Sequence, residues 1–525
     1  MAPGGVSLSR RRLLRTAAGT AVAVAFPIAG GDGARARSAR RGRRLGRPFG
    51  RPLPIPRVLT GSHLRIPIVE AEVPVLPGAP TRMWTYAGEF PGPTVRRPTG
   101  RPTTVEFHHR LPARAGELSV HLHGAHTPAA DDGQPGGLTR IQPRSLFCDI
   151  SPELSAAASG NDVLIRPGER RGYRYPFVEE GEPTRATTHW YHDHRLDNTG
   201  RNVWRGLAGV WIADDDVDGS LPLPREERDL ALTLCDRSFD GDNQLRNPFG
   251  GIGSAPDDGI TGGVILVNGA VLPHHAVPAA RHRLRVLNAS NFRSYNLRLP
   301  GVAMVQIGSD GGLMERPVAR GTVLIGPGER VDLIVDFRRA AHRDVVLESV
   351  RRAGGPNRLG SKTYVGPLMQ FRIGGRGGPD RTSVPAALRP LPDWVAQAPA
   401  EIAQEWRMTV GTGFRPSWLM NGRTFDPAFS DHRVRLGTTE AWRLVNKTAV
   451  AHLLHIHHTS FVLRSRNGRQ PAPWERGLKE TFFMDPGDEL EVVGRFTDYE
   501  GKYIVHCHML DHEDHGLMAQ FATHR

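Results

Sequence analysis

The stretch HCHMLDHEDHGLM, residues 506–518, decides how this sequence is interpreted. Side chains of a β-strand alternate between its two faces. If residues 506–508 are extended, Cys507 points to one face while His506 and His508 point to the other. His512, five residues further on, can return to the side of Cys507. A thiolate with imidazoles in a trigonal arrangement is typical of blue copper, so the stretch predicts two metal sites that share one tripeptide.

Three further histidine clusters accompany this tripeptide. Alone, it would also suit a buried structural cysteine flanked by histidines. The other clusters are His121-Leu122-His123-Gly124, Trp190-Tyr191-His192-Asp193-His194 and His452-Leu453-Leu454-His455-Ile456-His457. Each contains an H-x-H pair, which places two imidazoles on one face of a strand. Together the four clusters hold ten histidines and one cysteine, which are too many ligands for one metal ion and suit about four.

From about residue 58 to the C-terminus, these motifs resemble the multicopper oxidase family. VHLHG (120–124), WYHDH (190–194) and HCHxxxHED (506–514) are similar to the branch that contains bacterial spore-coat laccases and bilirubin oxidases. The resemblance implies an all-β chain of three cupredoxin-like Greek-key β-sandwich domains. It also implies four coppers per chain, one in a mononuclear blue site and three in a trinuclear cluster.

The resemblance also assigns the ligands. The mononuclear copper would be bound by His452, Cys507 and His512. In the cluster, one copper would be bound by His121 and His455, the second by His123, His192 and His508, and the third by His194, His457 and His506. The branch places an axial methionine ten residues after the cysteine, where this chain has Leu517, followed by Met518. We therefore expect a three-coordinate blue site with a non-coordinating Leu517.

Two acidic residues match the acids that relay protons in related laccases. They are Asp132, in TPAADDG, and Glu513, beside His512. The alternative is that both are surface carboxylates, as most acidic residues are. Asp193 and Trp190 are candidates for orienting the imidazoles, a role that packing residues can also fill. Electrons are expected to enter at an exposed His452 and to pass through Cys507.

An internal repeat predicts the domain organisation. Pro-Gly turns at Pro167, Pro327 and Pro486 each lead into an alternating strand, with spacings of 160 and 159 residues. Each is preceded by a second repeated strand: TTVEFHHRLP (103–112), RLRVLNAS (283–290) and AWRLVNKT (441–448). Short β-segments with Gly/Pro turns indicate sandwiches. We predict three β-sandwich domains at 58–216, 225–375 and 400–525, with a linker over 376–399.

The repeat also predicts where the metal lies. When Asn288 is aligned with Asn446, the histidines 452, 455 and 457 fall opposite Ser294, Leu297 and Leu299. The middle copy therefore has no copper ligands, and the cluster is expected between the first and third domains, with the middle domain as a spacer. A separate site at His274-His275 is the alternative, but adjacent strand residues point to opposite faces.

The basic charge is concentrated in a leader. The net charge is +14, but residues 1–51 contain twelve arginines and a single acid, Asp32, so this segment carries +11 of it. A nucleic-acid-binding surface is therefore not indicated. Arg10-Arg11, followed by the apolar stretch 16–29, resembles a signal for the twin-arginine export machinery; a disordered basic tail is the alternative. We expect residues 1–57 to be this signal peptide and a disordered linker, and the protein to be extracellular or in the cell envelope.

Two cysteines are left over once Cys507 is assigned to the metal. An exported protein permits a disulfide between Cys148 and Cys235, and two free thiols are the alternative. The ten methionines form no cluster, which argues against a specialised cuprous oxidase.

The expected activity is a laccase-like one. It couples four one-electron oxidations of phenolic or aromatic amine donors to the reduction of dioxygen to two waters. Bilirubin oxidation and the aminophenol oxidation that forms phenoxazinones stay open, because GLKE (477–480) and HEDH (512–515) are similar to the bilirubin oxidase subgroup. Proteins of this fold that serve as copper-free scaffolds should lack several ligands, whereas this chain keeps every one. Copper carriage or storage fits an electron-transfer arrangement poorly.

Overall fold

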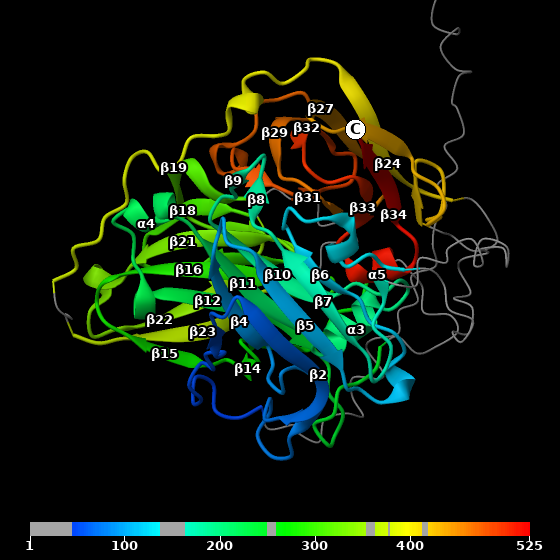
Figure 1. Ribbon diagram of the computed structural model, residues 1–525. Coiled ribbons are helices and arrows are strands. Elements are labelled where there is room, and N and C mark those ends of the chain that lie inside the picture. Colours follow the sequence, from blue (N-terminus) through cyan, green and yellow to red (C-terminus); the bar gives the residue numbers. More distant parts are fainter. Residues whose placement is uncertain (1–44, 137–162, 249–258, 353–362, 376–378, 412–417) are drawn as a thin grey trace, which may run out of the picture. The chain divides into compact units, whose positions relative to one another are not determined.

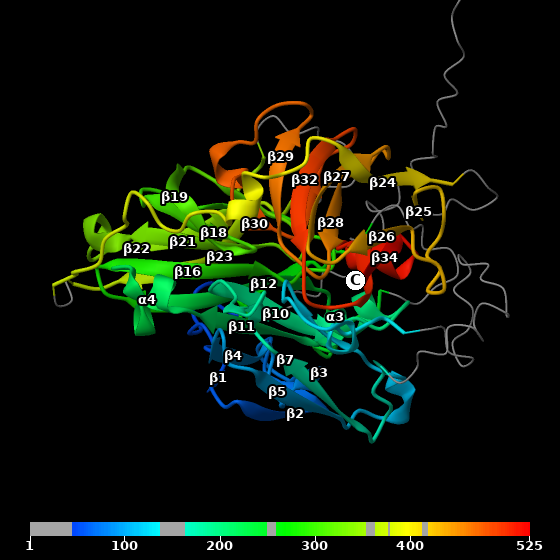
Figure 2. The same ribbon diagram turned by 45° about the horizontal axis from the view of Figure 1, so that its top comes forward.

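The computed structural model describes residues 45–136, 163–248, 259–352, 363–375, 379–411 and 418–525. Six large sheets pack in pairs as three cupredoxin-like Greek-key sandwiches, which confirms the predicted all-β fold. Figures 1 and 2 show the first sandwich in blue to teal, the middle one in green to yellow-green and the third in gold to red. The strands of these sheets fall inside the three predicted ranges.

The first sandwich joins a five-stranded and a four-stranded sheet. Their strand orders are β1 (Val58–Leu59), β4 (Gly92–Pro98), β11 (Ala208–Asp214), β10 (Thr187–Asp193), β6 (Val120–His123), and β3 (Thr81–Tyr86), β2 (His63–Val73), β5 (Thr103–His109), β7 (Arg170–Tyr175). The connections include β8 (Val178–Glu179), β9 (Glu182–Pro183), η1 (Ala113–Ala115), η2 (Ala129–Asp131) and α3 (Thr199–Arg205). Side chains of β5 alternate between buried and half-buried, as expected for a strand with one face on the core.

The middle sandwich follows α4 (Asp216–Ser220) and η4 (Glu226–Arg228). Its seven-stranded sheet has the order β14 (Ala270–Val271), β13 (Val264–Val267), β12 (Asp229–Arg237), β16 (Arg281–Asn288), β21 (Arg330–Asp336), β18 (Met304–Ser309), β19 (Gly312–Arg320). Its five-stranded sheet has the order β15 (His274–Val277), β23 (Gly366–Ile373), β22 (Asp344–Ser349), β17 (Tyr295–Arg298), β20 (Val323–Ile325). The turn η6 (Phe337–Ala340) follows β21.

The third sandwich follows η7 (Asp393–Val395). Its six-stranded sheet has the order β25 (Trp418–Met420), β24 (Ile402–Val410), β27 (Thr438–Asn446), β32 (Glu489–Phe496), β29 (Phe461–Arg466), β30 (Leu478–Lys479). Its five-stranded sheet has the order β26 (His432–Arg435), β34 (Met518–His524), β33 (Gly501–Cys507), β28 (His452–Ile456), β31 (Thr481–Met484). The short segments η8 (Pro473–Glu475) and α5 (Leu510–Asp514) complete it.

The internal repeat is visible in the backbone hydrogen bonds. In each copy, two hydrogen bonds join the turn to the end of a strand. The amide of the turn glycine donates to the carbonyl of the strand-end residue, and the amide of that strand-end residue donates to the carbonyl of the residue after the glycine. The pairs are Gly168 with His109, Gly328 with Asn288 and Gly487 with Asn446. The alignment of Asn288 with Asn446 is thereby confirmed, and the three turns are structurally equivalent.

The prediction that residues 45–57 are a disordered linker is wrong. Leu53 is buried, and its amide donates to the carbonyl of His274; the amide of Phe49 donates to the carbonyl of Leu272. The strand β15 lies at the edge of its sheet, where unpaired backbone groups and apolar surface accept a neighbouring segment. The predicted export signal, in residues 1–44, and Cys148 lie outside the described residues. Cys235 is a buried thiol.

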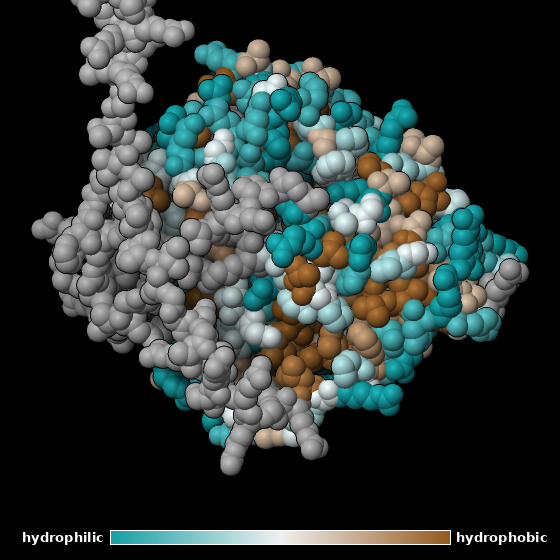
Figure 3. All heavy atoms as spheres, turned by 180° about the vertical axis from the view of Figure 1, so that it is seen from behind, coloured by the Kyte–Doolittle hydropathy of each residue, from teal (hydrophilic) through white to brown (hydrophobic). Residues whose placement is uncertain are grey.

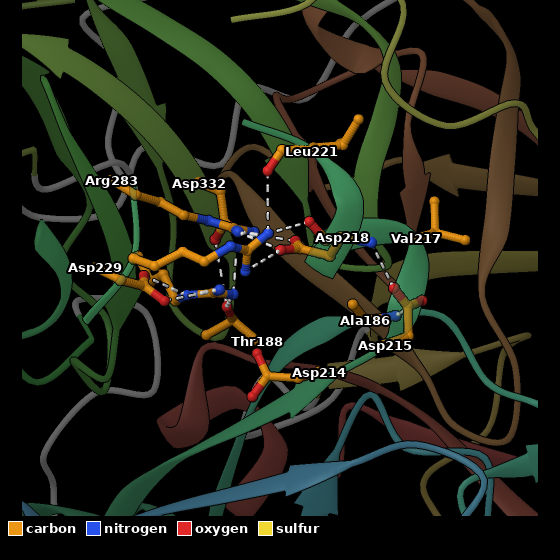
Figure 4. A network of polar contacts seen from close by, with 12 residues as sticks. Ala186, Thr188, Asp214, Asp215, Val217, Asp218, Leu221, Asp229, Arg283 and Asp332 are labelled. Atoms are coloured by element: carbon orange, nitrogen blue, oxygen red, sulfur yellow. Dashed lines mark hydrogen bonds and ion pairs between the residues drawn. The ribbon is translucent and has the colours of Figure 1, made fainter. Parts of the chain in front are cut away.

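Buried charges connect the middle sandwich to the first. On β16, Arg283 and Arg285 face three carboxylates, those of Asp218, Asp229 and Asp332 (Figure 4). The hydroxyl of Thr188, on β10 of the first sandwich, accepts a hydrogen bond from Arg285 Nη1 at 3.1 Å. The network therefore docks the middle sandwich against a strand that carries candidate metal ligands.

The surface combines hydrophilic areas with an apolar one. Figure 3 shows apolar side chains gathered on the face opposite to that of Figure 1. Ile55, Val58 and Val365 are more than half exposed. None of the described helices is long and apolar enough to cross a membrane.

Candidate metal centre

The strands bring the four histidine clusters together in two neighbouring pairs. In the first sandwich, β6 and β10 are antiparallel, and His121 lies opposite His192. In the third, β28 and β33 are antiparallel, and His455 lies opposite His506. Because side chains alternate along each strand, imidazoles of an H-x-H pair project from the same face. The first and third sandwiches thus bring their H-x-H histidines together.

Cys507 lies between two imidazoles at a separate site. His452 Nδ1 is 3.3 Å and His512 Nδ1 is 3.6 Å from Cys507 Sγ, and the two ring nitrogens are 3.1 Å apart. All three side chains are fully buried. Burial raises the pKa of the Cys507 thiol to about 12 and lowers the pKa of His452 to about 3. A thiolate at this position requires a cation, and the neutral imidazoles are in the form that binds metal.

Leu517 packs in the same apolar cluster as Cys507, and its carbonyl accepts a hydrogen bond from the Cys507 amide at 3.0 Å. Met518 belongs to another cluster, with Leu196 and Ile504. Leu517, and not Met518, therefore shares the apolar cluster of Cys507.

Each of the eight remaining imidazoles is buried among the others. They are His121, His123, His192, His194, His455, His457, His506 and His508. Three of them, His121, His192 and His455, donate from Nδ1–H to the backbone carbonyls of Asp132, Asp193 and Glu480, respectively. Their Nε2 atoms have no protein partner. His123 is reversed: its Nε2 lies 3.1 Å from Thr481 Oγ1, and its Nδ1 has no partner. Buried nitrogens without partners that converge on one point are what a metal cluster needs.

The spacing of the ring nitrogens supports several three-histidine sites. Donor atoms within 4.8 Å of one another occur in His194, His457 and His506; in His121, His455 and His457; and in His121, His123 and His192. The first set matches a predicted copper, and the second contains the predicted pair His121 and His455. His508 is absent from these sets, but its ring centroid lies 4.8 Å from that of His123. Among the described residues, no such set includes a residue of 225–375.

Burial favours the neutral form of His192 and His194. It is the largest cause of a pKa of about 3 at His192, where His194 adds to it, and of about 4 at His194, where Glu513 opposes it. Neutral imidazole is the form that binds metal, so the donor set fits several soft-to-intermediate cations such as copper.

Both predicted acids contact the imidazoles. His457 Nδ1 donates to Asp132 Oδ2 at 2.7 Å, and burial raises the pKa of Asp132 well above its usual range. Glu513 Oε2 lies 2.9 Å from His506 Nδ1, and Glu513 Oε1 lies 3.4 Å from His194 Nδ1. Burial alone would raise the pKa of Glu513, but the facing imidazoles outweigh it and lower that pKa.. Neither acid is a surface carboxylate.

Asp193 and Trp190 do contact the site. Trp190 stacks on His192 with ring centroids 4.1 Å apart, and the carbonyl of Asp193 accepts from His192 Nδ1. The Asp193 carboxylate accepts hydrogen bonds from Ser119 N and Asn202 Nδ2, which hold the strand ends.

Three polar neighbours were not predicted. Thr448 Oγ1 lies 2.9 Å from His452 Nε2, and Thr481 and Glu480 contact His123. Glu480 ends the GLKE segment (477–480), which is similar to the bilirubin oxidase subgroup. The sequence gives no signal that this acid approaches residues more than 350 positions away.

The expectation of an exposed His452 is wrong. Its side chain is fully buried, and so is that of His512. The ring of Trp418, on β25, lies 5.1 Å from His452 and 4.5 Å from His512, centroid to centroid. His452 Nε2 faces Thr448, whereas His512 Nε2 has no protein partner. Both imidazoles of this site are therefore enclosed by the protein, with Trp418 packed against them.

Comparisons with known proteins agree with this geometry. Models of the multicopper oxidase family match residues 68–148, 250–347 and 398–525. A laccase of Bacillus stratosphericus is 32% identical over 491 residues, which cover 84% of this chain and 90% of that protein. The chain belongs to the multicopper oxidase family. As a multicopper oxidase it is an oxidoreductase, and copper is the metal that its buried histidines and cysteine are arranged to hold.

Other relatives of this multicopper oxidase include a bilirubin oxidase of Albifimbria verrucaria, 30% identical over 83% of this chain and 72% of that protein. Among solved structures, a laccase from Pediococcus acidilactici is similar with a TM-score of 0.74 and 28% identity, covering 90% of this chain and 94% of the other. The oxidase thus resembles the bacterial laccase branch in both sequence and fold.

Proposed function

We propose that this multicopper oxidase is laccase-like and oxidises phenolic or aromatic amine donors with dioxygen. Four donors each lose one electron and one proton, and dioxygen takes up four electrons and four protons to give two waters. Four bound coppers, one mononuclear and three clustered, would supply the one-electron redox steps. The observation that carries the proposal is the tripeptide 506–508, whose cysteine faces one site while both histidines face the other.

The chain's own residues provide the path and the protons. Cys507 is joined to each flanking histidine through a single peptide unit, so a short covalent route connects the two sites. Asp132 contacts the imidazole of His457 and Glu513 that of His506, where a carboxyl group can relay protons to dioxygen. The burial of every candidate ligand excludes bulk water, which favours complete reduction within the site.

Oxidation of a larger donor, such as bilirubin or an aminophenol, is the second candidate. It is supported by the similarity to a bilirubin oxidase and by the GLKE and HEDH segments. Cuprous oxidation is less well supported, because the methionines of the third core, Met408, Met420, Met484 and Met509, are all buried.

The test is oxygen uptake by the copper-loaded protein with a simple methoxyphenol, together with copper content per chain and peroxide release. We expect four coppers, uptake and no peroxide. Blue, fully loaded protein that consumes no oxygen with the methoxyphenol but does so with bilirubin or an aminophenol would favour the second candidate. Protein that binds no copper would contradict both.

We also propose export by the twin-arginine route, on the basis of Arg10-Arg11 and the apolar stretch that follows. This route carries folded proteins, which suits a chain that takes up metal before export. Changing Arg10 and Arg11 together to lysine should retain the protein in the cell. Unchanged export of that variant would contradict the proposal.

A further inference from the structure

The three equivalent Pro-Gly turns differ in what they contact. Gly168, Gly328 and Gly487 all have a positive φ, of 90°, 82° and 84°. A methyl group added at Gly168 or Gly487 would meet nothing within 4 Å. At Gly328 it would lie 2.9 Å from Cγ and Nδ1 of His508. The turn of the middle sandwich therefore lies directly against a candidate copper ligand, whereas its counterparts face open space.

The neighbouring glycine of this turn supports the same ring indirectly. A methyl group at Gly326 would lie 2.7 Å from Leu453, whose carbonyl accepts the hydrogen bond of the His508 amide. The turn is itself held in place, because Gly326 N donates to Glu329 Oε2 at 2.7 Å and Gly328 N donates to Asn288 O at 2.9 Å. His508 is thus packed against backbone that has little freedom to move.

The turn ends at Arg330, a fully buried residue that reaches all three sandwiches. Its Nε donates to the carbonyl of Thr188 in the first sandwich at 2.8 Å, and its Nη2 donates to the carbonyl of Asp310 in the middle one at 2.9 Å. Its Nη1 forms an ion pair with Glu480 of the third. The planar fork of an arginine suits such a junction, since its five N–H groups have fixed directions.

Glu480 connects Arg330 to the histidine cluster. Its Oε1 lies 3.3 Å from His123 Nε2, and its carbonyl accepts a hydrogen bond from His455 Nδ1 at 3.1 Å. Partners of the second ring nitrogen fix the orientation of a ligating histidine. Arg330 and Glu480 therefore fix the direction in which His123 Nδ1 points.

We propose that the middle sandwich is a positioning element of the copper cluster, although none of its described residues is a candidate ligand. The turn of residues 326–330 fixes the orientation of the His508 ring by packing against it. It fixes the orientation of the His123 ring through Arg330 and Glu480. The inference rests on the proposed trinuclear cluster, in which His123 and His508 share one copper. It replaces the role of a simple spacer that the sequence predicted for this domain.

The first experiment compares Gly328→Ala with Gly168→Ala and Gly487→Ala. All three variants place a methyl group at a positive φ in equivalent turns, so the backbone penalty is matched. The measurements on copper-loaded protein are copper per chain, the near-ultraviolet absorption, the electron paramagnetic resonance spectrum and thermal unfolding. The near-ultraviolet band and the resonance spectrum report on the two coppers of the proposed cluster that are magnetically coupled, here called the coupled pair. We expect Gly328→Ala alone to weaken the near-ultraviolet band and to uncouple the pair, while the blue absorption of the Cys507 site persists.

The second experiment does not depend on the glycine variant folding. Glu480→Gln keeps the shape of the side chain and should release cluster copper at a chelator concentration about 10-fold lower than wild type. Glu475→Gln is the control. Like Glu480, Glu475 belongs to the third sandwich and forms an ion pair with an arginine, in this case Arg466, but it lies outside the candidate metal centre. Glu480→Asp should restore part of the copper retention.

The outcomes separate this inference from the proposed function. Wild-type protein without four coppers or without a coupled pair would overturn both. Normal wild-type spectra, together with Gly328→Ala and Glu480→Gln variants that match their controls, would overturn only the positioning role.

Discussion

Leu517 takes the place where the related branch has a coordinating methionine, and it packs with Cys507 in the apolar core. A thioether at this position stabilises the oxidised copper, so Leu517→Met should lower the reduction potential of the blue site. A fall of about 59 mV corresponds to a tenfold change in the one-electron equilibrium constant. A redox titration followed at the blue absorption band measures it. An unchanged or higher potential would show that Met518 already fills the axial position.

Glu513 faces two imidazoles from different sandwiches, so its effect should appear only when dioxygen is reduced. We expect Glu513→Gln to lower the rate of reoxidation by oxygen by about 100-fold or more, because an amide cannot accept a proton and pass it on as a carboxylate can. Anaerobic reduction of the blue site should be unchanged in stopped-flow measurements. Glu500→Gln, at an exposed position, is the control. Equal slowing of both half-reactions would argue against a proton relay.

At the scale of elements, the short strand β25 covers the proposed mononuclear copper site. Trp418 covers both imidazoles, so Trp418→Phe should shorten the approach to His512 and speed anaerobic reduction by a small inorganic reductant. Truncation to alanine should destabilise the fold by about 3–5 kcal/mol. Trp406→Phe, in the same core and packed on Trp442, is the matched control. Slower reduction of Trp418→Phe would instead indicate that the indole carries the electron.

At the scale of the whole molecule, the buried charges between sandwiches make stability depend on pH. Burial alone would raise the pKa of Asp229, but Arg285 and Arg283 outweigh it and hold that pKa well below the usual range (Figure 4). An aspartate in the unfolded chain titrates near a pKa of about 3.9. Folding therefore gains stability from this carboxylate above that pH, and the gain is lost as the pH falls toward the folded pKa.

The corresponding test is urea unfolding of Asp229→Asn. At neutral pH the variant should be less stable by about 3–5 kcal/mol, since the arginines lose a buried partner. The difference from wild type should shrink below about pH 4. Asp344→Asn, on the surface of β22, should show no such difference. A pH-independent difference would mean that packing rather than charge is responsible.

Much of the candidate site follows from local patterns in the sequence. The alternation in His506-Cys507-His508 predicts two faces, and the alignment of Asn288 with Asn446 predicts which copy has lost its ligands. The burial of His452 did not follow, because it depends on where Trp418 packs. The order in residues 45–57 did not follow either, because it depends on a free sheet edge that composition does not show.

The sequence by itself determined the ligand types, their spacing along strands and the repeated β-architecture, because these depend on covalent neighbours and on the period of a strand. Only the tertiary structure decided that Arg330 meets Glu480, 150 residues further along the chain, and that Gly328 lies against His508. Such contacts depend on how the three sandwiches pack together, and residue spacing along the chain carries no information about that packing.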